Sequence, residues 1–384
     1  MARLDHHTSR GSRRVAPAHV ALVAIILVAG CVQPEARGGM SASATPTDLG
    51  AAATQVPSLA PAPRDVLADG VIDTRASVRW LRATADAVWA GVQDAVLRLD
   101  PETGEIVDSI PIPDTRDTWF WSFEVAFDSL WVSYHPEDHS ARLLRVDLDS
   151  HEVVADIVIF DPARGGGAGG VLGAFGSLWV AMYHAGAVAR VDPATNSVAE
   201  WIDIGLPGAG GPWYLGVADG AVWTSRDQTQ DGTGAVLGSV ARIDAETGEV
   251  DAIGSASSFA MPCGPWAIDE EQVWTGSCNH RPALTRVDPQ DASEIATVRL
   301  DGTPGAPFLV HGRVWVPVVH DGEDSSLVAI DATTNEIEVT VAVRHEFFIL
   351  GNHVAPAVTA SGFAWIALAD GGIVRIAVED LAAA

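Results

Sequence analysis

The sequence predicts an all-β fold, a seven-bladed β-propeller built from four-stranded antiparallel blades. A Trp-centred segment recurs seven times at intervals of roughly 40 to 50 residues. An Asp-containing turn segment follows the first six copies, and each repeat holds four short strand-like runs without helical periodicity. One such sheet leaves its apolar faces uncovered. Neighbouring sheets that stack around a ring cover both faces of every blade.

The first repeated element is a Trp that follows an apolar residue and precedes small or β-branched ones. The chain has 13 Trp against 3 Tyr, an imbalance that indicates a repeated structural place for Trp. We expect these anchor Trp residues to fill the space between blades as core residues rather than to bind a cofactor. They are Trp89, Trp131, Trp179, Trp223, Trp274, Trp315 and Trp365.

Residues 171–204 show one repeat in full. Strands are expected at 171–175, 178–182, 187–191 and 197–204. The segment from Asp192 to Asn196 reads as a tight turn, because Asp caps the turn, Pro presets φ and Asn tolerates positive φ. Related turns recur after Leu99, Ile243 and Ile330.

The two ends of the repeat region predict how the ring closes. The seventh repeat ends near Glu379 after only three strands. Residues 66–76 contain a turn-to-strand segment like the missing fourth strand. We therefore predict that residues 66–76 complete the last blade, which removes an open sheet edge.

The N-terminal residues read as an export signal rather than as part of the fold. Basic residues precede an apolar run from Val20 to Gly30, which is too short to span a bilayer, since a spanning helix needs about 20 residues. The run ends at Cys31 in a pattern that resembles the lipobox of bacterial lipoproteins. The resemblance implies cleavage before Cys31, lipidation of Cys31, and a location on the extracytoplasmic side of the cell membrane.

Three regions follow from this division of the chain. Residues 1–30 are the expected lipoprotein signal peptide. Residues 31–64, rich in Ala, Ser, Thr, Pro and Gly, are the expected disordered tether. Residues 65–384 are the expected propeller.

The charge narrows the possible partners. The formal net charge is -27, and all 23 residues in the Lys and Arg total are Arg. A chain this acidic is repelled by phosphate backbones, so nucleic acid is excluded as an expected partner.

With Cys31 assigned to the lipid, Cys263 and Cys278 remain. They flank residues 269–272, the expected turn of a hairpin. Counting outward from that turn places Ile268 opposite Val273 and Cys263 opposite Cys278, near disulfide reach. An extracytoplasmic location permits the bond, and two buried thiols are the alternative.

One face of a propeller is formed by the loops that enter each first strand and by the loops that follow each Trp strand. Aromatic walls with a few His and Arg donors on this face would hold a polar organic ligand or an anion, while several neutral imidazoles would instead bind a divalent metal. Unrelated loop His residues and aromatic plugs of the channel are the alternatives, and no cofactor is predicted. The candidate ligand-binding residues are Trp121, Trp213, Trp266, Phe308 and His353 before or in first strands, and His135, His184, Arg226, His280 and His320 after Trp strands.

Three connections exceed the length typical of the repeat: residues 160–170, 226–238 and 344–353. The last contains an apolar stretch from Phe347 to Leu350. This stretch is interpreted as a lid, a partner contact or a plug of the channel. The chain contains no HExxH, GxSxG or Walker motif.

The repeat resembles the YVTN and streptogramin-lyase-like superfamily of β-propellers. The resemblance rests on the Trp strand together with segments such as Ala189–Pro193 and Ala194–Val198, and it covers about residues 66–379. Virginiamycin B lyases of that group use a Pro-His pair at first strands, a Glu after the Trp strand and a magnesium ion. Here Trp213, Trp266 and Phe308 follow the corresponding Pro residues. The resemblance therefore implies the fold and transfers no catalytic residue.

The leading functional hypothesis is a membrane-tethered extracytoplasmic module, monomeric, that binds a small polar ligand, a cell-envelope component or an exported protein. The alternative is a streptogramin-lyase-like lyase or hydrolase with a reassigned His-based site. A third possibility is an accessory subunit of a redox or transport system.

Overall fold

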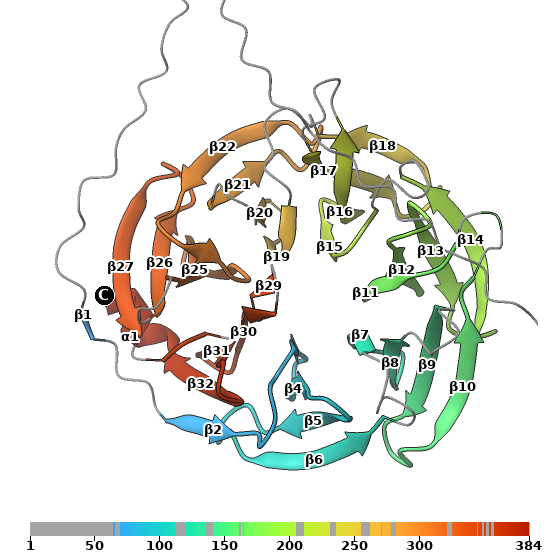
Figure 1. The fold of residues 1–384 in the computed structure, drawn as a ribbon, viewed down its shortest axis with the longest axis horizontal. Helices are drawn as coiled ribbons and strands as arrows, with labels where there is room; N and C mark the ends of the chain where they lie inside the picture. Colours follow the sequence, from blue (N-terminus) through green and yellow to red (C-terminus); the bar gives the residue numbers. More distant parts are fainter. Residues whose placement is uncertain are drawn as a thin grey trace, which may run out of the picture. The chain divides into compact units, whose positions relative to one another are not determined.

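Seven antiparallel sheets are arranged in a ring in the computed structural model of the chain (Figure 1). The described residues belong to one unit, Val56–Ala384. They are residues 64–65, 70–112, 120–134, 141–160, 163, 165–204, 211–230, 236–254, 262–269, 271–277, 282–320, 325–343, 345–347, 349–350, 353–354 and 357–383.

The blades follow one another in chain order, each with its first strand innermost and its fourth strand outermost (Figure 1). Blade 1 is β3 (Trp80–Ala83), β4 (Val88–Gly91), β5 (Ala95–Leu99) and β6 (Ile106–Pro111). Blade 2 is β7 (Phe120–Ala126), β8 (Ser129–Tyr134), β9 (Arg142–Asp147) and β10 (Val153–Val158). Blade 3 is β11 (Ala168–Ala174), β12 (Ser177–Met182), β13 (Ala187–Asp192) and β14 (Ser197–Asp203). Blade 4 is β15 (Leu215–Ala218), β16 (Ala221–Gln230), β17 (Val236–Asp244) and β18 (Val250–Ile253).

The remaining three blades complete the ring. Blade 5 is β19 (Pro262–Ile268), β20 (Val273–Ser277), β21 (Ala283–Val287) and β22 (Glu294–Arg299). Blade 6 is β23 (Thr303–Pro304) with β24 (Phe308–Val310), then β25 (Arg313–Val319), β26 (Ser325–Asp331) and β27 (Ile337–Val343). Blade 7 is β30 (Ala357–Ala360), β31 (Phe363–Ala367), β32 (Gly372–Ala377) and β2 (Val71–Asp73). The predicted fold class is confirmed, and the four strands expected in residues 171–204 are β11 to β14.

The ring closes as the sequence predicts. Strand β2 pairs antiparallel with β32, so that Ile72 lies opposite Ile373. The Thr74 hydroxyl donates to the Gly371 carbonyl at 2.7 Å, which adds a side-chain bond across the closure. The sequence did not predict β1 (Arg64–Asp65), which pairs parallel with β27 and adds one further strand to the outer edge of blade 6.

The anchor Trp residues lie between blades, as expected. Trp131 of blade 2 packs with Leu178 and Val180 of blade 3, and Trp365 of blade 7 packs with Leu81 of blade 1. All seven indole rings are at most 4% exposed. In four blades the indole Nε1–H donates to the carbonyl five residues earlier, at the end of the first strand; these residues are Trp131, Trp179, Trp223 and Trp365.

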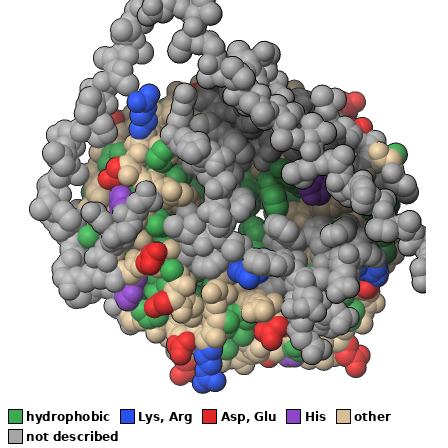
Figure 2. Space-filling model, in the orientation of Figure 1, with side chains coloured by type: hydrophobic (Ala, Val, Ile, Leu, Met, Phe, Trp, Pro, Cys, Tyr) green, Lys and Arg blue, Asp and Glu red, His purple; other side chains and the backbone are tan. Residues whose placement is uncertain are grey.

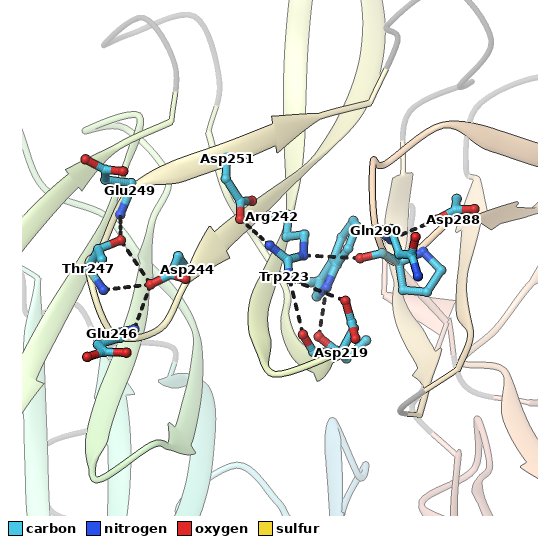
Figure 3. A network of polar contacts seen from close by, with 12 residues as sticks. Asp219, Trp223, Arg242, Asp244, Glu246, Thr247, Glu249, Asp251, Asp288 and Gln290 are labelled. Carbon is cyan, nitrogen blue, oxygen red and sulfur yellow. Dashed lines mark hydrogen bonds and ion pairs between the residues drawn. The ribbon is translucent and has the colours of Figure 1, made fainter.

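A strand-three Arg faces the anchor Trp in every blade except blade 6, where Ala329 takes its place. Figure 3 shows the example of blade 4, in which Arg242 lies beside Trp223 and reaches Asp219, Asp251 and the Pro289 carbonyl of blade 5. The same reach to the next blade recurs in blades 2, 5 and 7. These Arg residues therefore join neighbouring blades.

Other segments differ from the sequence expectations. The helix α1 (Val378–Ala383) follows β32 and buries Leu381, which the repeat pattern does not indicate. The polar insertion after Arg226 lengthens β16 and β17 into an extended hairpin.

Among the described residues, no helix has the length and apolar character that a membrane crossing requires.

The connection between blades 6 and 7 packs down onto the ring. Phe347 is 0% exposed and lies in the core shared by those two blades. After it, β28 (Ile349–Leu350) and β29 (His353–Val354) form a small hairpin, and β29 lies near the centre of the ring beside β19 (Figure 1).

The expected register of the Cys hairpin holds only near its turn. Ile268 lies opposite Val273, as predicted, but the register then shifts and places Pro262 opposite Ser277. Simple counting outward from the turn therefore fails beyond Trp266. Cys278 and Cys31 lie outside the described residues, so the disulfide and the lipid anchor stay predictions.

Candidate ligand-binding site at the centre of the ring

First strands line the centre of the ring, and two aromatic side chains meet across it. Trp80 begins β3 in blade 1, and Tyr214 directly precedes β15 in blade 4. Their ring centroids are 5.8 Å apart, with the ring planes tilted by 52°. Blades 1 and 4 lie on opposite sides of the ring (Figure 1), so this contact crosses the centre of the ring.

A charged pair lies next to this aromatic contact. Arg82 is two residues beyond Trp80 on β3, and its guanidinium stands 5.7 Å from the Trp80 ring centroid. The Arg82 Nε is 3.4 Å from the Glu124 carboxylate, which comes from β7 of blade 2. The Arg82 and Glu124 side chains are 26% and 17% exposed, so the pair is largely desolvated. Ionic contacts at such a place are stronger than on the open surface.

Burial controls the protonation of two groups here. It raises the pKa of Glu124, against the opposing effects of the Arg82 guanidinium and of the Val125 amide, which donates to the carboxylate. Burial likewise raises the pKa of Tyr214, whose phenol therefore stays neutral under ordinary conditions. The site thus offers a neutral phenol beside one guanidinium and one proton-binding carboxylate.

An aromatic extension leads from this centre to blade 3. Tyr183 stacks on Trp213 with ring centroids 4.7 Å apart, and His184 lies 5.0 Å from the Tyr183 ring. Two Gly residues allow the approach: a Cβ at Gly170 would lie 2.6 Å from the Trp213 carbonyl, and one at Gly167 would lie 2.6 Å from the His184 ring. Figure 2 shows hydrophobic side chains beside the central hollow of the ring, with a His at their edge.

Two further polar atoms on first strands are buried without a partner. The Ser122 hydroxyl on β7 and the Trp266 indole N–H on β19 make no hydrogen bond in the described part of the chain. A buried donor without an acceptor costs free energy.

The structure brings together some of the sequence-predicted residues. Trp213 and His184 share the Tyr183 cluster. His320 is held within its own blade, where Nε2 contacts the Ser326 hydroxyl at 2.9 Å, and Trp266 is half-buried at the edge of the core between blades 4 and 5. Phe308 is 4% exposed in the core of blades 6 and 7, where a ligand would reach it only by opening that core.

Five predicted residues stay untested in the geometry of the site. His135 and His280 lie outside the described residues. Trp121, Arg226 and His353 lie on β7, β16 and β29, and their side chains are outside the description. In the described part of the chain, no three His, Cys, Asp or Glu side chains gather as a metal site.

Sequence reasoning missed Trp80, Arg82 and Glu124, although a signal was present. Each first strand places one residue opposite its anchor Trp. In five blades this residue is uncharged, namely Leu172, Gly216, Ala267, Phe308 and Val358. Blades 1 and 2 carry Arg82 and Glu124 instead. Charges at a position that is otherwise apolar or Gly would have indicated a site.

Comparison with known proteins supports the fold. The chain is a seven-bladed β-propeller. No family model matches it, and no curated protein matches it. Among solved structures 1044 chains match, too many for the likeness to indicate one activity. One belongs to the "Crystal Structure of Mitotic Checkpoint Complex", with a TM-score of 0.59 at 13% identity over 88% of this chain and 98% of that chain. At this identity the likeness shows the fold alone.

Proposed function

We propose that this propeller is a ligand-binding module whose site is the aromatic and charged cluster at the centre of the ring. The observation that carries the proposal is the meeting of Trp80, Tyr214, Arg82 and Glu124, from three different blades, in one partly desolvated place. A propeller needs only apolar first strands to close its centre. Charges placed there are costly to desolvate, and a role in ligand recognition would account for their presence.

The chemistry of the cluster favours a small polar organic ligand with one apolar face. Trp80 and Trp213 offer flat apolar surfaces, while Arg82 donates and the ionised Glu124 accepts hydrogen bonds. Sugar-containing fragments of the cell envelope combine these properties.

We further propose that the module is tethered to the extracytoplasmic side of the cell membrane through Cys31. The apolar run before Cys31 and the Ala-, Pro- and Ser-rich residues after it support this. Labelling of the expressed protein with a fatty-acid analogue tests it. The label is expected on the natural chain and absent from Cys31→Ser, and equal labelling of both would contradict lipidation at this residue.

Ligand binding is tested with the purified chain and a panel of envelope saccharides and muropeptides, using a thermal shift and calorimetry. A ligand that raises the melting temperature is expected to lose at least tenfold in affinity with Trp80→Leu and with Glu124→Gln, since these remove a stacking face and an acceptor. Leu309→Met, on the first strand of blade 6 and away from the cluster, is the matched control.

The same purified chain and panel also distinguish the binding module from the enzymatic alternative. Turnover of a panel member that requires a divalent metal, and that His184→Ala together with His320→Ala abolishes, would replace the binding module with a lyase or hydrolase. Ligand affinities that Trp80→Leu and Glu124→Gln leave unchanged would remove the site from the centre of the ring.

A further inference from the structure

One face of the ring carries the loops that follow each Trp strand. The opposite face carries the turns between strands 1 and 2 and between strands 3 and 4 of each blade. Both kinds of turn share this face because an antiparallel blade reverses direction at each strand, and Ser129 at the start of β8 accordingly lies opposite Asp147 at the end of β9. We call it the turn face. It includes none of the residues of the candidate site described above.

Two neighbouring turns on the turn face carry exposed Phe residues. Phe127 joins β7 to β8 in blade 2, and Phe175 joins β11 to β12 in blade 3. They are 37% and 45% exposed. A Cβ at Gly173, two residues before Phe175, would lie 3.7 Å from the Phe127 ring, so Phe127 leans onto blade 3. The two Phe residues stand on neighbouring turns at the interface of blades 2 and 3, and we refer to them together as the apolar patch.

The backbone disfavours Phe at these positions. The φ angles are +52° at Phe127 and +51° at Phe175, and each is followed by a second residue of positive φ in a two-residue turn. Such turns prefer Asn, Asp or Gly, because a Cβ at positive φ crowds the backbone. The equivalent turns of blades 4, 6 and 7 hold the smaller or more polar Asp219, His311 and Ser361. Because both side chains stay partly exposed, their packing recovers only part of the stability that a buried Phe gives, and packing alone does not account for Phe at these two positions.

The turns around the patch carry more acidic than basic side chains. Among the described residues of these turns the basic side chains are His151 and His311. Arg residues of the strands also reach this face, and those near the patch or at a strand end are held by partners: Arg145 by the Pro193 carbonyl, Arg190 by the Ser177 hydroxyl and Arg313 by Glu338. Acidic side chains stand in the turns of blades 1 to 6; near the patch they include Asp128, Asp147, Asp149, Asp192 and Asp219. Backbone amides donate to Asp147 and Asp192 and lower the pKa of both, so these carboxylates stay charged as the pH falls.

From these observations we propose that the turn face docks a cationic, amphipathic polypeptide segment of another protein. Its apolar side chains would cover Phe127 and Phe175, and its Lys or Arg side chains would meet the surrounding carboxylates. An anionic membrane surface is disfavoured as the occupant, because the carboxylates that ring the patch would repel it.

Selection of a random peptide library on the full chain tests this proposal. The selected peptides are expected to carry net positive charge and at least one large apolar residue. Their affinity is expected to fall at least tenfold between 50 and 300 mM salt, and at least tenfold in Phe127→Asn with Phe175→Asn. Since Asn suits positive φ, the double variant is expected to melt no lower than the natural chain, which separates lost binding from lost folding.

His311→Asn in blade 6 is the matched control, at the same turn position with φ of +49°. It is expected to leave peptide affinity unchanged. Four results would overturn the proposal: selected peptides without positive charge, equal binding to the double variant, binding to phosphatidylglycerol vesicles that the double variant loses, or self-association through the two Phe residues. Each of these leaves the proposed ligand site at the ring centre unaffected.

Discussion

The anchor Trp shows how one residue type serves seven similar places with different local chemistry. Trp179 donates its Nε1–H to the Ala174 carbonyl at 3.1 Å, and the Arg190 guanidinium lies 5.1 Å from its ring centroid. Trp315 of blade 6 has neither contact: its buried Nε1 has no partner among the residues that the structure describes, and Ala329 stands where the other blades have Arg. Blade 6 therefore retains the packing of Trp without its polar contacts.

This difference predicts that a Trp→Phe substitution lowers the free energy of unfolding by different amounts in different blades. Trp179→Phe is expected to lower the free energy of unfolding by about 1–2 kcal/mol more than Trp315→Phe, because it also loses a hydrogen bond and a cation–π contact. Urea unfolding of both variants beside the natural chain measures the difference. Equal losses would mean that only the volume of the aromatic side chain matters for the stability that the anchor Trp provides.

Glu124 gives a prediction for pH. Burial raises its folded-state pKa, so the folded chain holds this proton to a higher pH than the unfolded chain does. The resulting stability is complete below the unfolded pKa of about 4.3, and it is lost as the pH rises through the folded pKa. Relative to Glu124→Gln, the natural chain is therefore expected to lose stability as the pH rises above the unfolded pKa, by about 1.4 kcal/mol per pH unit at most.

Denaturant unfolding at several pH values measures this effect. Arg82→Met removes the guanidinium that lowers the pKa of Glu124, so the loss of stability is expected to be larger in total and to continue to higher pH. A stability difference between the natural chain and Glu124→Gln that grows in favour of the natural chain with rising pH would contradict the prediction.

At the scale of the element, the turn between strands 3 and 4 and the strand-three Arg work together. In four turns one Asp oxygen accepts the amides of the residues two and three positions later, which fixes the direction of the carbonyls; these are the turns of Asp100, Asp147, Asp244 and Asp331. Arg286 of blade 5 donates to the Ala332 carbonyl in the turn of Asp331, and Arg145 of blade 2 likewise donates to the Pro193 carbonyl in the turn of Asp192 at 2.8 Å. A rigid turn thus presents a fixed acceptor to the neighbouring blade.

We expect Arg145→Met to lower the free energy of unfolding by about 1–3 kcal/mol, since a charged donor is lost and a carbonyl at the blade interface loses its partner. Arg98→Met is the matched control. Arg98 also lies over its anchor Trp, but its ion pair is with the exposed Asp86 of its own blade. Both substitutions remove a cation–π contact. Beyond that common loss, Arg98→Met should lower the free energy of unfolding by under about 1 kcal/mol. Equal effects would show that the bond between blades contributes nothing.

The elements also show which features the sequence could predict. The Trp strands and the turn at Asp192 follow from local patterns, and these were confirmed. The role of Arg145 depends on a carbonyl of the next blade, and the Trp80–Tyr214 contact joins residues 134 positions apart in the chain. Such pairings are set by the radius of the ring rather than by neighbours in the sequence. The register shift after Trp266 likewise arises from a bulge that counting residues does not detect.

At the scale of the whole molecule, closure joins residues far apart in the chain. Strand β2 supplies the outer edge of blade 7, and a Cβ at Gly104 of blade 1 would lie 2.9 Å from the Ile72 side chain. Arg375 of β32 donates to the Glu102 carbonyl of blade 1 at 2.5 Å. The N-terminal strand therefore supports both its own blade and the contact between the last blade and the first.

Truncation distinguishes the contributions of β1 and β2 to the melting temperature. A chain that begins at residue 70 lacks β1 but keeps β2, and it is expected to melt within a few degrees of the natural chain, because β1 adds only a two-residue parallel pairing. A chain that begins at residue 78 loses β2 and the Thr74 bond to Gly371. It is expected to melt about 10 °C lower, since several kcal/mol of pairing and packing are lost from a domain of this size. The exposed edge of β32 is also expected to promote self-association.

A peptide spanning residues 66–77, added in excess, should restore the melting temperature of the chain that begins at residue 78, because it can pair with β32 as β2 does. A variant peptide with Ile72→Asp should not, since a charge at that position cannot pack against the core between blades 7 and 1. Scanning calorimetry follows both additions. If the two truncated chains melt together, or if both peptides act alike, β2 does not close the ring in solution.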